Sequence, residues 1–298
     1  MKILIISNNE RGLKLIDSLK KKFVVSTALA PKINSKIDGI ANSLKIPKDI
    51  NNPNFIKKID QLSIELIILA GFNQIISKPT LNASKSIWIN LHAGDLPSMR
   101  GSSPLNWALI KDHKKISINI IKVEPGVDSG DIIETRNISI TKSDNIKTLH
   151  NKVNLTFPKM ALSAIKKISE KKNIKFQKQK SNFSYYPIRF PEDGLIFFDK
   201  FKALEIHNII RALMKPYPNA YTFHKGHKIK IIESRIPKNN YFGEAGRIYR
   251  IVNNEILVCA KDKSLWIKTE KKPDYYGLKK YFKLATITEA ALNFYENR

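Results

Sequence analysis

The chain has 298 residues, with 52 lysine or arginine and 26 aspartate or glutamate side chains, so its formal net charge is +26 at pH 7. This length suits two domains of ordinary size, and a hydrophobic fraction of 42% is sufficient for packed cores. No run of about 18 apolar residues is present, which argues against a membrane-spanning helix. The single cysteine, Cys259, excludes an internal disulfide, and no Cys/His cluster has metal-ligand spacing, so we expect a cytoplasmic protein without a metal.

The large positive charge has two readings that the sequence leaves open. A strongly basic chain is typical of proteins that bind nucleic acid. The lysines are dispersed along the chain, however, and asparagine and isoleucine are also abundant, so heavy lysine use on solvated faces explains the charge equally well. A basic surface also attracts a small anionic substrate such as a sugar nucleotide.

Strands and helices alternate over the first half of the chain, which is typical of a parallel sheet with helices on both faces. We expect strands at residues 2–7, 23–30, 65–70, in the stretch that ends near Asn90, and at 116–123 and 132–140. We expect helices near residues 10–21, 35–44, 55–62, 104–111 and 144–167. The segment after the first strand, Asn8-Asn9-Glu10-Arg11-Gly12, lacks the Gly-rich dinucleotide fingerprint, which argues against a nicotinamide enzyme.

The second half of the chain has a different pattern. Residues 166–180 are lysine-rich and poor in large apolar side chains, and we interpret them as a helix end followed by a solvated linker. An amphipathic helix at 202–214 then precedes short strands at 221–223, 228–233, 246–250 and 256–258. Such short strands predict a small β-rich, barrel-like domain. The expected fold is α/β, with a parallel-sheet domain over residues 1–180 and the smaller domain over residues 181–298.

One strand end carries the most informative pair of side chains. The apolar run from Trp88 ends in Asn90 and His92, and residues two apart on a strand point to the same face. An amide donor beside a titratable imidazole suits acyl transfer, with Asn90 holding an oxyanion and His92 moving a proton. A second strand is followed by a turn that contains Asp128, whose carboxylate can orient His92.

These residues resemble the folate-dependent formyltransferases. The resemblance rests on Asn-x-His at Asn90 and His92, on the Leu-Pro and Arg-Gly pairs that follow, and on Asp-Ser-Gly-Asp from Asp128. The superfamily includes methionyl-tRNA formyltransferase, glycinamide ribonucleotide transformylase and sugar-nucleotide N-formyltransferases, among them the aminoarabinose formyltransferase. The resemblance implies a Rossmann-like N-terminal domain, 10-formyltetrahydrofolate as the co-substrate, and Asn90, His92 and Asp128 as the catalytic residues.

The resemblance also implies where the substrates bind. The main chain of two stretches is expected to hydrogen-bond the pterin ring: Asn73, Gln74, Ile75 and Ile76, and Glu124, Pro125, Gly126 and Val127. Arg100 and Gly101 are expected to meet an anionic substrate, because an arginine presents a cation there. His113, His150 and His207 belong to no motif, and we interpret them as structural or surface residues.

The acceptor amine is predicted from weaker signals. Ser103-Pro104-Leu105-Asn106-Trp107 resembles the aminoarabinose formyltransferase domain, where the tRNA enzymes usually show Pro-Ile-Gln. The segment 30–36 passes directly into a helix-like pattern, so the basic loop of the tRNA enzymes looks shortened, and residues 186–194 resemble sugar formyltransferases. We therefore predict transfer of the formyl group to the primary amine of an amino-sugar nucleotide through a tetrahedral intermediate. Sugar formyltransferases are often dimers, so a homodimer is one expected assembly.

Other functions remain open at the level of sequence. The main alternative is a methionyl-tRNA formyltransferase that acts on initiator Met-tRNA, which the net charge of +26 favours. Formylation of another amine, hydrolysis of formyl-folate, and a catalytically silent nucleic-acid-binding protein are further alternatives. The last of these predicts RNA binding that weakens steeply with salt.

Overall fold

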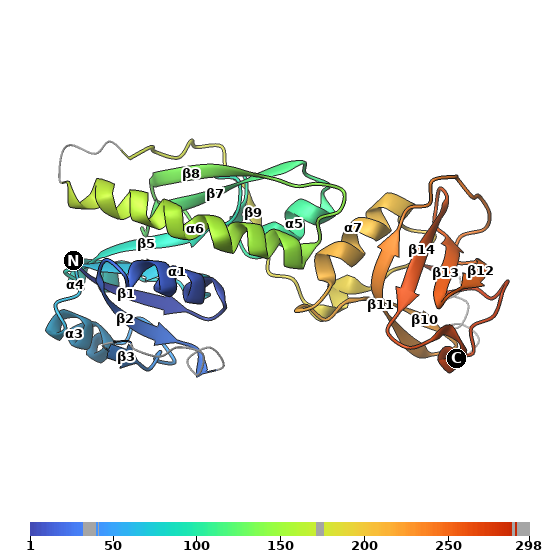
Figure 1. Ribbon diagram of the computed structural model, residues 1–298, viewed down its shortest axis with the longest axis horizontal. Helices are drawn as coiled ribbons and strands as arrows, with labels where there is room; N and C mark the ends of the chain where they lie inside the picture. Colours follow the sequence, from blue (N-terminus) through green and yellow to red (C-terminus); the bar gives the residue numbers. More distant parts are fainter. Residues whose placement is uncertain (32–39, 41, 171–175, 288–289, 291–298) are drawn as a thin grey trace. The chain divides into compact units, whose positions relative to one another are not determined.

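The computed structural model describes residues 1–31, 40, 42–170, 176–287 and 290, which form two compact units (Figure 1). The first unit contains residues 1–104, 115–139 and 150–187, and the second contains residues 105–114, 140–149 and 188–298. Within the described ranges, no helix is long and apolar enough to cross a membrane.

A seven-stranded sheet forms the centre of the first unit. Its strands, in spatial order, are β3 (Asn42–Leu44), β2 (Val24–Leu29), β1 (Lys2–Ser7), β4 (Leu66–Leu69), β5 (Ile87–His92), β7 (Lys115–Lys122) and β8 (Ile132–Ser139). The first five strands are parallel, as predicted, but β7 and β8 are antiparallel to their neighbours. The predicted parallel arrangement is therefore confirmed for β1 to β5, and the full sheet is mixed, because β7 runs opposite to the other strands while β8 runs with them. Only residues 123–131 separate β7 from β8, and so short a connection joins antiparallel strands.

Helices cover both faces of this sheet. The helices associated with the first unit are α1 (Arg11–Leu19), α3 (Pro53–Gln61), α4 (Lys78–Ala83) and α6 (Ile146–Ser169). Leu4 and Ile6 of β1 pack in one cluster with Ile59 of α3, while the intervening Ile3 and Ile5 face the opposite side of the sheet. The alternation of strands and helices along the sequence therefore predicted correctly that helices cover both faces of the sheet.

One predicted helix is contradicted where it can be observed. A helix was expected over residues 35–44, but residues 42–44 form β3, in which Asn42 pairs with Ser26 of β2. Strand β2 leaves backbone groups at the edge of the sheet that can hydrogen-bond these residues. Pairing with β2 stabilises them more than the helix that their weak periodicity suggested. Most of the rest of that prediction, residues 35–39 and 41, lies outside the described residues.

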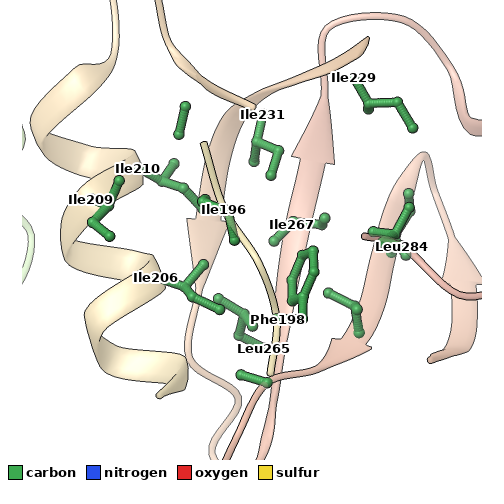
Figure 2. Packing of buried hydrophobic residues seen from close by; sticks show 14 of the residues in the cluster. Ile196, Phe198, Ile206, Ile209, Ile210, Ile229, Ile231, Leu265, Ile267 and Leu284 are labelled. Atoms are coloured by element: carbon green, nitrogen blue, oxygen red, sulfur yellow. The ribbon is translucent and has the colours of Figure 1, made fainter. Parts of the chain in front are cut away.

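The second unit is built on a five-stranded antiparallel sheet. Its strands, in spatial order, are β10 (Ala220–His224), β11 (His227–Arg235), β14 (Ser264–Thr269), β13 (Glu255–Cys259) and β12 (Ile248–Val252). Helix α7 (Ala203–Leu213) packs its isoleucines against this sheet, and Phe198 and Leu284 complete the core (Figure 2). The β-rich prediction is confirmed, although β14 was missed. Among the described strands the sheet is open, with β10 and β12 at its edges.

The two units are interleaved along the chain. Helix α5 (Pro104–Ile110) belongs mostly to the second unit, where Asn106 Nδ2 donates to the backbone oxygen of Ala212 at 2.7 Å. Arg211 of α7 likewise donates to the backbone oxygens of Thr141 and Asp144, at 3.2 and 2.9 Å. A single cut after residue 180 therefore does not describe how the units are assembled, because earlier segments contribute to the second one.

Short elements complete the chain. A two-stranded parallel pair joins β6 (Arg100–Gly101) to β9 (Tyr185–Tyr186), with Gly101 opposite Tyr186. Two 3-10 turns, at Pro191–Gly194 and Pro273–Tyr276, lie in the second unit. The β6–β9 pair matters for function because it fixes the loop that follows β5.

Candidate active site

The carboxyl end of β5 presents the predicted pair. Asn90 aligns with Leu69 of β4 and with Ile121 of β7, so it lies on an interior strand of the sheet. Its side chain is half-buried, while His92 is only 5% exposed. As expected from their spacing, both side chains lie on one face, because both reach the same carboxylate, that of Asp128.

Asp128 bridges the two β5 side chains. Its Oδ1 accepts a hydrogen bond from Asn90 Nδ2 at 3.1 Å, and its Oδ2 lies 3.3 Å from His92 Nδ1. The backbone N–H of Gly101 donates to the same Oδ2 at 2.9 Å. The φ angle of Asp128 is +48°, a left-handed conformation that aspartate tolerates better than most residues because its side chain is short and polar. The turn thus aims the carboxylate back at β5.

Both ring nitrogens of His92 face acceptors. Nε2 lies 2.7 Å from the backbone oxygen of Met99, which can only accept, so this nitrogen carries a hydrogen. A doubly protonated ring donates to Met99 and to Asp128 at once. Gly94 makes this approach possible, because a Cβ built there would stand 2.7 Å from His92 Nε2 and 2.9 Å from the Met99 oxygen. No local sequence pattern singles out Met99 or Gly94.

The predicted folate stretches follow β4 and β7, the two strands on either side of β5 in the sheet of the first unit. Ile76, after β4, and Val123, after β7, belong to one hydrophobic cluster with Trp88 of β5. The cluster therefore contains Ile76 of the first stretch and Val123, the residue just before the second stretch. Among the described residues, the backbone amides of Asn73 and Gln74 donate to no protein acceptor, which leaves them for a ligand.

Some groups in these stretches already have protein partners. Asn73 Oδ1 accepts from Asn8 Nδ2 at 2.6 Å, and Gln74 Oε1 accepts from the backbone N–H of Ile50 at 2.8 Å. The Ile75 carbonyl accepts from Asn51 Nδ2 at 3.0 Å. These side-chain contacts hold the loop in shape, so a ligand has to use the remaining main-chain groups. In the second stretch, Pro125 and Gly126 are exposed while Glu124 and Val127 are half-buried.

Arg100 has contacts that the sequence did not predict. The residue is 6% exposed, and its guanidinium donates through Nε and Nη2 to Gln179 Oε1, at 3.0 and 2.8 Å. It also lies over the ring of Phe183, 4.4 Å from the ring centre. Binding of an anionic substrate by Arg100 stays a prediction, and these contacts point instead to a role inside the protein. Gly101 beside it has a φ of +97° and binds Asp128 through its backbone.

Two other histidines are held in the protein framework. Burial and the neighbouring positive charge of Arg11 lower the pKa of His150 to about 4. His207 Nδ1 lies 2.9 Å from Ser234 Oγ, and burial lowers its pKa. In the described ranges, no group of three or more His, Cys, Asp or Glu side chains is arranged to hold a metal ion.

Comparison with known families covers most of the chain. Residues 2–165 match the family described as Formyl transferase, and residues 190–276 match Formyl transferase, C-terminal domain. The chain belongs to the formyltransferase family. The prediction of an N-formyltransferase that uses a folate formyl donor is therefore confirmed at this level.

Relatives of this formyltransferase include proteins with different names at the same level of identity. Methionyl-tRNA formyltransferase from Caldanaerobacter subterraneus subsp. tengcongensis is 32% identical over 212 residues, which cover 71% of this chain and 68% of that one. Bifunctional polymyxin resistance protein ArnA from Wigglesworthia glossinidia brevipalpis is 32% identical over 229 residues, which cover 74% of this chain and 33% of that protein.

Solved structures share the fold of this formyltransferase. The N-formyltransferase from Helicobacter canadensis, in complex with folinic acid and dTDP-3-aminofucose, has a TM-score of 0.68 at 17% identity, and the match covers 90% of this chain and 99% of that one. HypX from Aquifex aeolicus in complex with tetrahydrofolic acid also gives 0.68 at 17% identity. That match covers 90% of this chain but 43% of HypX, so the chain spans less than half of its length.

Proposed function

We propose that this formyltransferase transfers the formyl group of 10-formyltetrahydrofolate to the amine of methionine on initiator Met-tRNA. The observation that carries the proposal is the 32% identity with a methionyl-tRNA formyltransferase, which extends over 71% of the chain. The net charge of +26 has the sign that a tRNA backbone requires. The sequence motifs alone favoured an amino-sugar nucleotide, and the relatives support the alternative.

Two of the motif arguments for a sugar acceptor lose weight. Asn106, in the Pro-Leu-Asn-Trp segment, is 1% exposed, and its amide nitrogen is bound to Ala212 in the second unit. The hydrogen bond between α5 and α7 accounts for an asparagine at this position without any contact to a substrate. The argument from a shortened loop at 30–36 falls largely on residues 32–36, which lie outside the described residues.

Asn90 is the residue best placed to stabilise charge on the transferred group. When bound, 10-formyltetrahydrofolate supplies an electrophilic formyl carbon whose oxygen becomes negative during transfer. The Asn90 amide nitrogen carries two hydrogens, of which Asp128 accepts one at 3.1 Å. The second hydrogen is free to donate to the developing oxyanion, a contribution that grows as the charge develops.

Asp128 and His92 are the residues that we propose to move protons. The acceptor amine attacks as the neutral species and then loses a proton, which the Asp128 carboxylate accepts directly or through a water. His92, 3.3 Å from that carboxylate, returns a proton to the departing folate nitrogen. Because Nε2 is engaged by Met99, this return requires the imidazole to exchange that contact for one to the substrate.

The donor fits the residues present. The backbone amides of Asn73 and Gln74, which donate to no group among the described residues, suit the hydrogen-bonding edge of a pterin, and Ile75 beside them is 61% exposed. We propose that Asn73, Gln74, Ile75 and Ile76, with Glu124, Pro125, Gly126 and Val127, hold the folate mainly through their main chain.

An amino-sugar nucleotide is the second candidate acceptor. The structural match to the Helicobacter canadensis enzyme covers 99% of that chain, so no large part of a sugar-nucleotide enzyme is without a counterpart here. Homodimerisation, predicted from the same resemblance, stays a prediction that light scattering tests.

The test offers both acceptors to the purified protein with 10-formyltetrahydrofolate. Charged initiator tRNA and a panel of dTDP- and UDP-amino sugars are supplied in parallel, and products are identified by mass. We expect formyl-Met-tRNA, with an apparent affinity that falls steeply as salt is raised from 50 to 200 mM, because tRNA binding releases counterions. Asn90→Ala serves as the impaired enzyme and Asn82→Ala, at an exposed position of α4, as its matched control.

Each other outcome contradicts this proposal in its own way. A formylated sugar nucleotide without formyl-Met-tRNA supports the second candidate. Formate released without any acceptor identifies a formyl-folate hydrolase. No reaction with any amine, together with salt-sensitive RNA binding, identifies a catalytically silent RNA-binding protein.

A further inference from the structure

The side-chain amide of Gln179 has all of its hydrogen-bonding positions filled by protein groups. Its Oε1 accepts two hydrogen bonds from Arg100, at 3.0 and 2.8 Å. Its Nε2 donates to the backbone oxygens of Asp128 and Gly130, at 2.8 and 2.7 Å. An amide has two acceptor sites and two donor hydrogens, so every one is used. The guanidinium can only donate, which fixes the orientation of the amide.

These bonds hold the main chain of the residue whose carboxylate joins Asn90 to His92. Gln179 donates a hydrogen bond to the backbone carbonyl of Asp128, while the backbone N–H of Gly101 donates to the Asp128 carboxylate at 2.9 Å. Asp128 is thus fixed from both its backbone and its side chain. The φ of Asp128, +48°, is a left-handed conformation that aspartate can adopt, and these hydrogen bonds hold the residue in it.

The contacts close into a ring. Arg100 binds Gln179, Gln179 binds the Asp128 backbone, the Asp128 carboxylate binds Gly101, and Gly101 follows Arg100 in the chain. The ring is anchored by Phe183, which stacks on Arg100 and meets Tyr185 edge-on, with the two ring centres 5.4 Å apart. Pairing of β6 with β9 holds Gly101 in place.

We propose that Gln179 is a positioning residue for formyl transfer, which acts by orienting the Asp128 carboxylate, and that Arg100 serves as its anchor. This inference rests on the proposed function only in that Asp128 takes part in the reaction. It gives a role to a residue in the segment 166–180, which the sequence presents as a solvated linker.

Two substitutions separate the halves of the Gln179 amide. Gln179→Glu keeps the length and the acceptor for Arg100, but it sets a carboxylate against the carbonyl oxygens of Asp128 and Gly130. Gln179→Met keeps the length and removes all four hydrogen bonds. We expect both to lower kcat roughly 10- to 100-fold, because small misplacements of reacting groups cost rate of this order. The KM for the acceptor should change less than about threefold.

A double-mutant cycle distinguishes positioning from a merely structural role. If Gln179 acts through Asp128, adding Gln179→Met to Asp128→Asn slows single-turnover transfer no further, because the group being oriented is already impaired. A structural role predicts the same fractional loss in both backgrounds. Gln177→Met is the matched control, since this exposed side chain lies two residues away and the Ile132 bridge uses only its backbone.

The outcomes also separate this inference from the proposed function. Wild-type turnover in Asp128→Asn removes the proposed role of Asp128 itself. A slow Asp128→Asn enzyme together with wild-type kcat in Gln179→Glu and Gln179→Met overturns the inference alone. If Arg100→Lys raises the KM for an anionic acceptor and leaves kcat unchanged, the inference is also overturned, because Arg100 then binds the substrate. Thermal unfolding of each variant shows whether it is folded at the temperature of the kinetic assay.

Discussion

Asn90 and Asp128 are joined by a 3.1 Å hydrogen bond from Asn90 Nδ2 to Asp128 Oδ1, across 38 positions of sequence. The bond fixes which way the Asn90 amide faces, because a carboxylate accepts only from the nitrogen end. One hydrogen of that nitrogen is thereby committed to the protein and the other is directed away from Asp128. A preorganised donor of this kind needs no reorientation when charge develops on the substrate.

Replacing Asn90 tests that donor directly. We expect Asn90→Ala to lower kcat by about 10²- to 10³-fold, the usual cost of removing one oxyanion donor. Asn90→Asp should be at least as slow, because a second carboxylate would face Asp128. Single-turnover formyl transfer measures both, with Asn82→Ala as the control. Near-wild-type turnover in Asn90→Ala contradicts the assignment.

Gly94 should be intolerant of any side chain. A Cβ there would stand 2.7 Å from His92 Nε2 and 2.8 Å from Pro104 Cβ, so Gly94→Ala must displace the imidazole from Met99. We expect a loss of about 1–3 kcal/mol in the free energy of unfolding, as for other overpacked positions. Formyl transfer should fall with it, since His92 moves.

The control for Gly94→Ala is Gly226→Asn in the β10–β11 turn. Its φ is +76°, which asparagine tolerates, and no atom lies within 4 Å of a Cβ built there. Denaturant unfolding and formyl transfer are measured on both variants. An unchanged rate in Gly94→Ala would mean that the Met99 contact does not hold His92 during turnover.

Arg211 should stabilise the second unit more than an exposed arginine does. It donates to Asn208 Oδ1 at 2.9 Å, to the backbone oxygens of Thr141 and Asp144, and to Asp112 at 3.2 Å. Arg211→Met removes the hydrogen bonds that the guanidinium donates, one of which is buried, so we expect to lose about 2 kcal/mol of stability. Denaturant unfolding measures this loss.

The matched control for Arg211→Met is Arg235→Met in the same unit. The Arg235 side chain is 53% exposed and pairs with Glu255, and such surface pairs contribute about 0–1 kcal/mol. Hydrogen exchange of the amides of residues 140–149 should accelerate only in Arg211→Met. Equal effects of the two substitutions would contradict a special role for the buried cation.

The sequence was sufficient for features that depend on local periodicity. Alternation of strand and helix predicted the layers, and the spacing of Asn90 and His92 predicted that both face one site. Strand direction was not predictable, because an apolar run such as that of β7 has the same pattern whichever way it runs. Gln179 was missed for a related reason. Its partners Arg100 and Asp128 lie 79 and 51 positions away, and no local pattern encodes such contacts.

Acid should destabilise the folded state partly through His150. Burial and Arg11 lower its folded pKa to about 4, against 6.5 in the unfolded chain. Between these values the unfolded state binds a proton that the folded state does not, so stability falls as the pH falls from about 6.5 towards 4. Each pH unit costs at most about 1.4 kcal/mol from this residue. Above pH 7 its contribution is constant.

Removing the titrating group should flatten that slope. We expect His150→Gln to show a weaker dependence of the unfolding free energy on pH between 6.5 and 4, measured by urea titration at closely spaced pH values. His227→Gln is the control, because this exposed histidine stands at the start of β11. If His150→Gln and the wild-type chain keep parallel stability curves over that range, His150 is not held neutral in the folded protein. A curve for His227→Gln that follows the wild type shows that the effect is specific to the partly buried imidazole beside Arg11.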